Sequence, residues 1–495
     1  MTAIVVDHRK GKAGPGPAEP PPGDDAPLYE ARRKIYPQSV SGTYRRVRWI
    51  VLLVTLGIYY LLPFVRWDRG PNAPDQAVLI DLPARRFYFF FIEIWPQEIY
   101  FFTGLLILAS MALFLMNALA GRVWCGYLCP QTVWTDLFLA IERLCEGDRR
   151  ERMLRDSHPL TAGGVARKSA KHTLWLITAW WTGGAWVLYF ADAPTLVVEL
   201  ATGEAPLIAY AAIATLTFTT YSLAGLMREQ VCLYMCPWPR IQAALTDEDA
   251  LNVTYRVDRG EPRGSLKKAA ALRAAGQPAG DCIDCGQCVA VCPTGVDIRD
   301  GASLGCIQCG LCIDACDTVM RRVGQPERLI AYDTDLNIQR RLRGEPEQFR
   351  LIRPRTILYS AIIVLVGAIM VYALAVRSPV GVAVQHDRNP VAVILSDGEV
   401  RNGYALRLVN KAAVETTFLV SVAGPAGARL DIVGGTLEEG GAVSVTVGPD
   451  QTRELRALVT AAPLPGKDTS APIVFRAVDA VTGITAAVDD TFRMP

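Results

Sequence analysis

The stretch CIDCGQCVAVCP, residues Cys282–Pro293, decides how the central part of this 495-residue chain folds. A second stretch of the same kind, CIQCGLCIDACD at Cys306–Asp317, follows shortly afterwards. Both have the spacing C-x2-C-x2-C-x3-C of bacterial ferredoxins, in which the fourth cysteine of each run ligates the other cluster. Gly286 and Gly310 permit tight turns between the thiolates. The spacing therefore predicts a bacterial-type ferredoxin insert that holds two 4Fe–4S clusters.

The same pattern predicts which thiolates hold each cluster. Zinc usually takes two separated cysteine pairs, and cytosolic thiols stay reduced, so zinc sites and disulfides are the less favoured interpretations. Asp317 replaces the proline after the second run, and ligation should survive this change. No Rossmann or P-loop pattern is found near the runs, so direct use of a nicotinamide is not indicated. One cluster is expected to take Cys282, Cys285, Cys288 and Cys316, and the other Cys292, Cys306, Cys309 and Cys312.

Two further cysteine pairs lie in RVWCGYLCPQTVW (Arg122–Trp134) and VCLYMCPWPRI (Val231–Ile241), each with the pattern C-x3-C-P. On a helix this spacing places both sulfurs on one face, and the proline should kink or end that helix. Paired soft thiolates suit Cu(I), zinc or an iron–sulfur centre, or they can cycle as a dithiol. The alternative is small apolar side chains packed between helices. The candidates are Cys125, Cys129, Cys232 and Cys236, whereas Cys145 is interpreted as structural.

Long apolar segments predict a membrane domain with five helical spans. About half of the chain is apolar, and a span needs about 20 residues. Tyr, Trp and Arg at the segment borders disfavour the alternative of buried helices in a soluble protein. The pair Gly183–Gly184 would let another helix approach closely. The five segments are Trp49–Val65, Ile99–Ala120, Thr173–Ala191, Leu207–Met227 and Thr356–Val376.

Loop charges predict the orientation in the membrane. Nine Lys and Arg residues precede the first segment, nine lie in Gly121–His172, and none lies in Asp192–Pro206. By the positive-inside rule, the N-terminus and the Arg228–Arg355 insert are cytoplasmic, and the chain from Arg377 is periplasmic. Both C-x3-C-P pairs then lie at the cytoplasmic face. The five segments contain no histidine, which disfavours transmembrane bis-histidine haem.

The pattern changes after Arg377 to short alternating runs such as TTFLVSVA, with glycine, asparagine and proline between them. About seven to nine strands without cysteine predict an immunoglobulin-like β-sandwich. A formal charge of +2 gives no indication of a nucleic-acid partner. The expected organisation is a partly disordered cytoplasmic N-terminus (1–46), a membrane domain with four spans (47–245), a ferredoxin-like domain (246–350), a fifth span (356–376) and the sandwich (378–495).

The motifs resemble one family closely. GRVWCGYLCPQTVW, REQVCLYMCPWPRIQ, DRGEPRG (Asp258–Gly264), the double ferredoxin run and RNGYALRLVNK (Arg401–Lys411) are similar to the FixG/RdxA/CcoG family, over almost the whole chain. These proteins are accessory factors of cbb3-type cytochrome c oxidase. The resemblance implies a polyferredoxin-like protein of the bacterial cytoplasmic membrane that reduces Cu(II) to Cu(I) for the oxidase. It makes Cys125, Cys129, Cys232 and Cys236 the candidates for copper contact or relay.

The implied partners are copper ions, a cytoplasmic or quinol electron donor, copper chaperones and oxidase assembly factors, and the chain could form a homo-oligomer. Two other functions stay open. One is a quinol-linked electron-transfer subunit for a periplasmic reductase, since polyferredoxin membrane subunits with paired C-x3-C-P motifs are similar. The other is a non-catalytic scaffold for oxidase assembly, acting through the sandwich.

Overall fold

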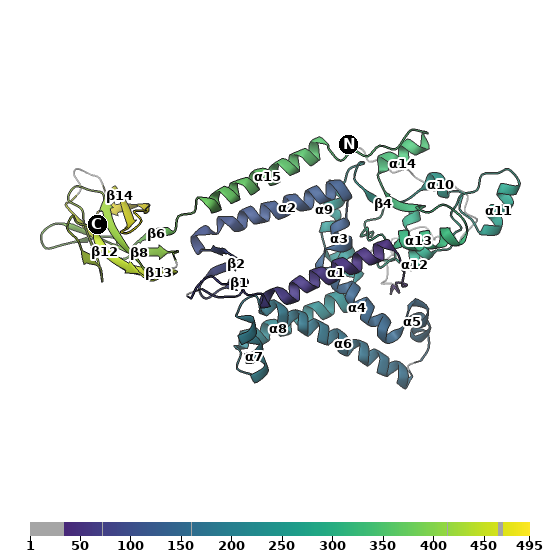
Figure 1. Ribbon diagram of the computed structural model, residues 1–495, viewed down its shortest axis with the longest axis horizontal. Helices are drawn as coiled ribbons and strands as arrows, with labels where there is room; N and C mark the ends of the chain where they lie inside the picture. The colour runs from purple at the N-terminus through teal and green to yellow at the C-terminus, as the bar shows by residue number, and fades with distance from the viewer. Residues whose placement is uncertain (1–33, 72, 160, 413, 464–468) are drawn as a thin grey trace, which may run out of the picture.

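A computed structural model describes residues 34–71, 73–159, 161–412, 414–463 and 469–495. The predicted disorder near the N-terminus falls largely on residues 1–33, which lie outside the described residues. The molecule is elongated, with long helices along its length (Figure 1). A cysteine-rich module lies at one end of these helices and a β-sandwich at the other (Figure 1). The chain therefore has three parts in the order that the sequence predicts.

Four helical segments in the described residues are long and apolar enough to cross a membrane: Thr43–Phe64, Pro96–Ala120, Leu207–Met227 and Pro354–Ala375. They contain α1 (Thr43–Leu61), α2 (Tyr100–Ala120), α8 (Leu207–Thr220) and α15 (Pro354–Ala375). The third predicted span, Thr173–Ala191, is not among these four. It belongs to α6 (Ala162–Val187), which begins earlier, includes Lys168, Lys171 and His172, and ends four residues before Ala191.

Helix α6 nevertheless packs along α8, as its glycine pair predicts in part. A Cβ atom on Gly183 would lie 2.9 Å from the carbonyl oxygen of Ile213, so the close approach of the helices requires this glycine. Gly184 faces open space instead. The short helix α7 (Ala193–Thr202) links the two at the sandwich end of the molecule (Figure 1).

Both chain segments with C-x3-C-P leave the membrane helices through irregular turns. After α2 the chain forms α3 (Val123–Tyr127) and α4 (Pro130–Glu146). After α8 it forms π-helical turns at Tyr221–Met227 and Val231–Met235, and then α9 (Trp238–Leu245). Helix α5 (Arg149–Asp156) connects α4 to α6.

The cysteine-rich module is built around two short helices that each follow a left-handed glycine. Gly286 (φ 65°) precedes α12 (Gln287–Ala290), and Gly310 (φ 73°) precedes α13 (Leu311–Arg322), which confirms the predicted tight turns. The antiparallel strands β4 (Asn252–Tyr255) and β5 (Ile330–Asp333) close the module. Its other helices are α10 (Val257–Gly260), α11 (Leu266–Ala274) and α14 (Asp335–Leu342).

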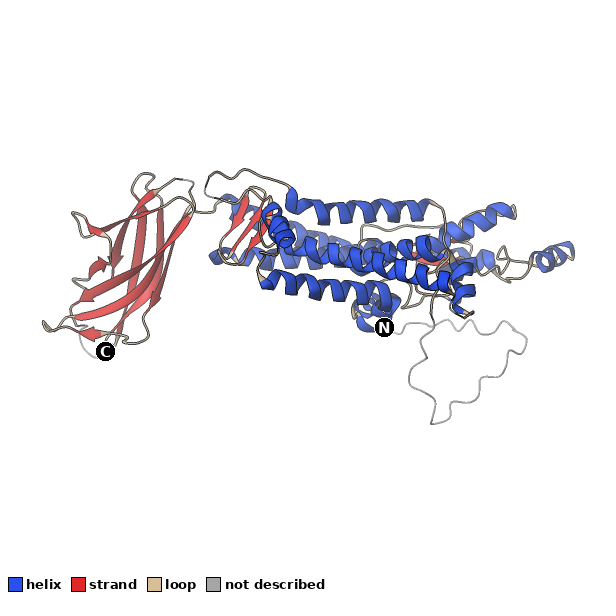
Figure 2. Ribbon diagram, turned by 90° about the horizontal axis from the view of Figure 1, so that it is seen from below, coloured by secondary structure: helices blue, strands red, loops and turns tan. Residues whose placement is uncertain are grey.

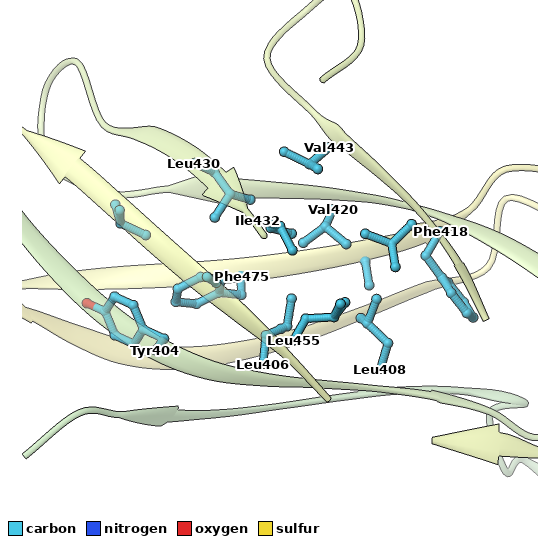
Figure 3. Packing of buried hydrophobic residues seen from close by; sticks show 14 of the residues in the cluster. Tyr404, Leu406, Leu408, Phe418, Val420, Leu430, Ile432, Val443, Leu455 and Phe475 are labelled. Carbon is cyan, nitrogen blue, oxygen red and sulfur yellow. The ribbon is translucent and has the colours of Figure 1, made fainter. Parts of the chain in front are cut away.

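The C-terminal part is a sandwich of two five-stranded antiparallel sheets. Side chains from both sheets fill its core, among them Tyr404, Leu406, Phe418 and Phe475 (Figure 3). The described residues form ten strands rather than the predicted seven to nine, because two of them are only two residues long. They are β6 (Val380–His386), β7 (Val393–Ile394), β8 (Val400–Asn410), β9 (Thr416–Ala423), β10 (Arg429–Ile432), β11 (Thr436–Leu437), β12 (Val443–Val447), β13 (Gln451–Ala461), β14 (Ser470–Asp479) and β15 (Thr485–Arg493).

A small sheet that the sequence did not predict lies where the helices meet the sandwich (Figure 2). Its strands are β1 (Val78–Asp81), β2 (Arg86–Phe89) and β3 (Ile92–Ile94). Arg86 forms an ion pair of 2.6 Å with Asp450, and Lys411 forms one of 2.6 Å with Glu98. These contacts attach the sandwich to the end of the helices.

Candidate functional site: a twelve-cysteine junction

Two small cavities of about 20 Å³ each lie inside the cysteine-rich module. Their linings divide the eight cysteines of the module as the ferredoxin spacing predicts, except that Cys288 borders both cavities. The residues present therefore suit two clusters that lie next to each other. The first cavity is lined by Cys282, Cys285, Cys288 and Cys316, and the second by Cys292, Cys306, Cys309 and Cys312 together with Cys288.

Local backbone geometry directs these thiols inward. Asp284 and Gln308, at equivalent places in the two runs, both have positive φ, so each loop turns back on itself. Backbone N–H groups of Val289, Gln308 and Leu311 donate to the sulfurs of Cys288, Cys306 and Cys309, respectively. Such donors stabilise the thiolate form that ligates iron.

Burial makes the free thiols poor acids. It raises the pKa of Cys288 to about 11 and the pKa values of Cys306 and Cys316 to about 12. The pKa of Cys312 is raised well above its usual value for the same reason. Because a metal ligand must be a thiolate, a positively charged iron centre would have to displace these protons when it binds.

The two C-x3-C-P pairs do not lie on single helical faces, and that expectation was wrong. Cys125 lies in α3, but Cys129 is extended (ψ 126°) immediately before Pro130, which begins α4. Cys232 lies in a π-helical turn, and Cys236 is extended (ψ 121°) before Pro237. A residue before proline avoids the α conformation, so each proline ends its helix between the two cysteines, as the sequence predicted.

The four membrane-edge thiols, Cys125, Cys129, Cys232 and Cys236, lie close enough that the charges of the other three act on Cys125. Burial raises the pKa of Cys125 to about 12, and the charges of the other three thiols raise it further. Burial also raises the pKa of Cys232 to about 12, with contributions from Cys129 and Cys236. Cys125 Sγ donates to Gln242 Oε1 of α9 at 3.2 Å, and Cys236 is exposed. All thirteen cysteines are free.

No three His, Cys, Asp or Glu side chains among the described residues converge tightly enough to hold a single metal ion. This holds for the four membrane-edge thiols and for the eight cysteines of the module alike.

The four-thiol group abuts the second cavity. A Cβ atom on Gly126 would lie 2.8 Å from the carbonyl oxygen of Ile307, within the second cysteine run. The hydroxyl of Tyr127 donates to the carbonyl of Cys309 at 3.1 Å. A further cavity is lined by both Cys232 and Thr294, and Thr294 also lines the second cluster cavity. The polypeptide therefore brings the membrane motifs and one ferredoxin site into direct contact.

Two buried arginines at this junction were not predicted from the sequence. Arg122 donates to the carbonyls of Leu304 (2.6 Å), Cys306 (3.3 Å) and Pro239 (2.7 Å). Arg48, on α1, forms an ion pair with Asp136 of α4 at 3.3 Å and interacts with the Cys309 thiol. Arg122 directly precedes the first C-x3-C-P helix, but its sequence spacing gives no sign of its contacts with the module.

Comparisons with known proteins agree with this architecture. The family model "4Fe-4S dicluster domain" matches residues 227–335, and "4Fe-4S binding domain" matches residues 101–144. A third, described as an IG-like fold at the C-terminal of FixG, matches residues 370–495. With its apolar helices and twelve clustered cysteines, the chain is a membrane-bound iron–sulfur redox protein.

Relatives place the chain in a family. Nitrogen fixation protein FixG of Rhizobium meliloti (strain 1021) is 49% identical, covering 88% of this chain and 87% of its own. Protein RdxB and protein RdxA of Cereibacter sphaeroides are 50% and 48% identical, over 90% and 88% of this chain and 91% of each of theirs. The chain belongs to the FixG/RdxA family, as its motifs predicted. A crystal structure of a FixG-related protein from Vibrio parahaemolyticus matches 24% of this chain and 97% of its own at 24% identity, with a TM-score of 0.20.

Proposed function

We propose that this protein reduces Cu(II) to Cu(I) for the assembly of a cbb3-type cytochrome c oxidase. The observation that carries the proposal is the contact between the four membrane-edge thiols and the second cluster cavity. Iron–sulfur clusters, when bound, take up and release single electrons, which matches the one electron that each Cu(II) requires. The two cavity linings supply the proposed ligand sets, with Cys288 assigned to the first.

The four membrane-edge thiols are the proposed copper contacts. Soft thiolate ligands favour Cu(I) over Cu(II), so they stabilise the product of the reduction. Cys236 is exposed and offers the ion access, whereas Cys125 and Cys232 are more deeply placed. A wide thiol group that holds an ion loosely suits a reductase, because the product has to leave.

The test is Cu(I) formation by purified full-length protein after chemical reduction, followed with a Cu(I)-specific chelator. A Cys125→Ala/Cys129→Ala variant that keeps its iron should lose most of the activity, because the copper contacts are gone. A Cys145→Ala variant is the matched control and should stay active, since this thiol lies at the other end of α4. Full activity in the double variant with iron retained would refute the proposed copper site.

We further propose that the module is cytoplasmic and the sandwich periplasmic, with the domain limits that the sequence predicts. The nine basic residues of 121–172 support this orientation. The sandwich would then be available to copper chaperones and assembly factors outside the membrane. Membrane-impermeant thiol labelling of cells carrying one added surface cysteine in the sandwich should label the protein, and a cysteine added to α11 should stay unlabelled until the cells are lysed.

A quinol electron donor is the second candidate, favoured by one cavity. His172, Trp175, Lys171 and Arg228 line it, and Arg228 also lines the cavity that contains Cys232. His172 Nδ1 lies 2.8 Å from the hydroxyl of Tyr221, so a proton acceptor is present for quinol oxidation. Two electrons would pass to the protein and two protons to water. A reduced quinol analogue should then reduce the anaerobic protein, and His172→Gln should slow this step.

A further inference from the structure

Buried positive charge lies beside the second cluster cavity, on Arg48 and Arg122. Arg45 and Arg48 share one carboxylate, Asp136, at 2.8 and 3.3 Å, so the three side chains carry a net charge of +1. Arg48 is 5% exposed, and its Nη1 atom has no hydrogen-bond partner among the described residues. This guanidinium interacts with the thiol of Cys309 by charge and by hydrogen bonding.

Arg122 adds a second uncompensated charge. The residue is 7% exposed, and its guanidinium bonds only to backbone carbonyls among the described residues, with no carboxylate partner. Burial lowers the pKa of Arg122, and the charges of the Cys125 and Cys306 thiols act against this effect. An unpaired guanidinium is expensive to bury, which indicates that ligated thiolates supply its counter-charge.

The charged side chains beside the first cavity carry a net negative charge. Its arginine, Arg299, is neutralised by Asp297 at 2.6 Å and Asp284 at 2.5 Å. Asp317 lies beside Cys316 and raises the pKa of that thiol, after the larger effects of burial and Cys288. Cys285 is exposed on this side. Counting Arg299 against its two aspartates and Asp317 gives a net charge of −2.

We propose that Arg48 and Arg122 direct electrons from the first cluster site to the second. A cluster gains one negative charge on reduction, so nearby positive charge raises its reduction potential. Burial of the second site acts against this, but desolvated guanidinium groups are not screened by water and outweigh it. A one-electron reductant would deliver each electron near exposed Cys285, and the electron would leave near Cys125. The transfer reduces one site by one electron and oxidises the other, with no proton and no bond change.

This inference rests on the proposed iron–sulfur sites but not on copper chemistry, so copper is omitted from its test. Purified full-length protein in detergent is titrated with dithionite, and each cluster is followed by electron paramagnetic resonance. Arg122→Gln should lower the higher of the two midpoint potentials and leave the lower one unchanged. We expect about a tenfold loss in the equilibrium constant for electron sharing, which is about 59 mV for one electron. Arg122→Lys keeps the charge and should restore most of the potential.

Arg299→Gln is the matched control on the first side. It should lower only the lower potential, and Arg48→Gln should act as Arg122→Gln does. Iron content of about eight per chain has to be retained in each variant, and Arg122 carries the test if Arg48→Gln loses iron. The proposal is overturned if Arg122→Gln, with its full iron content, shifts the lower midpoint potential or leaves both midpoint potentials unchanged. If the potentials shift as predicted but the protein does not reduce copper, only the proposed copper substrate is overturned.

Discussion

At the scale of single residues, the contact between membrane and module rests on small or charged side chains. Gly126 leaves no room for a Cβ atom beside the backbone of the second cysteine run. Asp314 of α13 accepts hydrogen bonds from the backbone N–H groups of Tyr44 (3.2 Å) and Arg45 (2.7 Å), so a module residue caps the first membrane helix. Neither contact can be anticipated from local sequence, because the partners are far apart in the chain.

Gly126→Ala should loosen this contact. The added methyl group meets backbone atoms of Ile307 and Gln308, which cannot rotate away, and overpacking of this kind costs about 1–3 kcal/mol. We expect a lower melting temperature and faster loss of iron during purification. Gly184→Ala is the control, since nothing lies within 4 Å of its added methyl group. Equal stability of the two variants would contradict the close approach.

Asp136→Ala should destabilise the protein more strongly. It leaves Arg45 and Arg48 without their shared carboxylate in a buried setting, and breaking such a pair costs about 3–5 kcal/mol. Thermal unfolding in detergent measures the loss. Glu454→Ala removes an exposed partner of Arg407 in the sandwich and should change the melting temperature little. Similar shifts for the two variants would argue against a buried network.

At the scale of elements, prediction from sequence succeeded where period and spacing carry the signal. The strand β9 coincides with the run TTFLVSVA. Two cavities separate the cysteine sets that the ferredoxin spacing assigns, apart from Cys288, and the ligand assignment itself stays a prediction. The predicted bounds of α6 were wrong, because its charged N-terminal half belongs to the same helix. The sheet β1–β3 was not predicted, because its strands are too short for a clear alternation. The prediction that both cysteines of a pair share one helical face was wrong, because proline disfavours the α conformation of the residue before it.

The small sheet should make the attachment of the sandwich depend on pH. Burial, and next the charge of Asp450, raises the pKa of Glu93 to about 7, well above its usual value. A raised carboxyl pKa contributes stability at low pH, and this contribution is lost as pH rises from about 5 through 7. We expect the melting temperature to fall over this interval and Glu93→Gln to reduce the slope. An unchanged slope in the variant would exclude Glu93 as the source.

At the scale of the whole molecule, the reductase and scaffold functions make different demands. A scaffold needs the sandwich and the fold, whereas a reductase also needs the cluster ligands. Cys282→Ala and Cys306→Ala in cells should therefore abolish assembly of the cbb3-type oxidase while the protein level holds, as immunoblots and oxidase activity would report. Normal oxidase activity in these variants would favour the scaffold. The sequence named Cys125 and Cys232 as candidates, but their proximity could not be derived from it, because only the fold brings the two segments together.

The close packing of Gly126 against the module has a consequence for how electrons enter the protein. A module capped onto α1 and pressed against α3 cannot swing out to meet its donor, as a tethered carrier on a flexible linker does. The module stays in one position, and turnover then depends on how often the reductant collides with the exposed face near Cys285. Ionic strength should therefore change the rate through this encounter, whereas membrane fluidity and linker length should leave it unaffected.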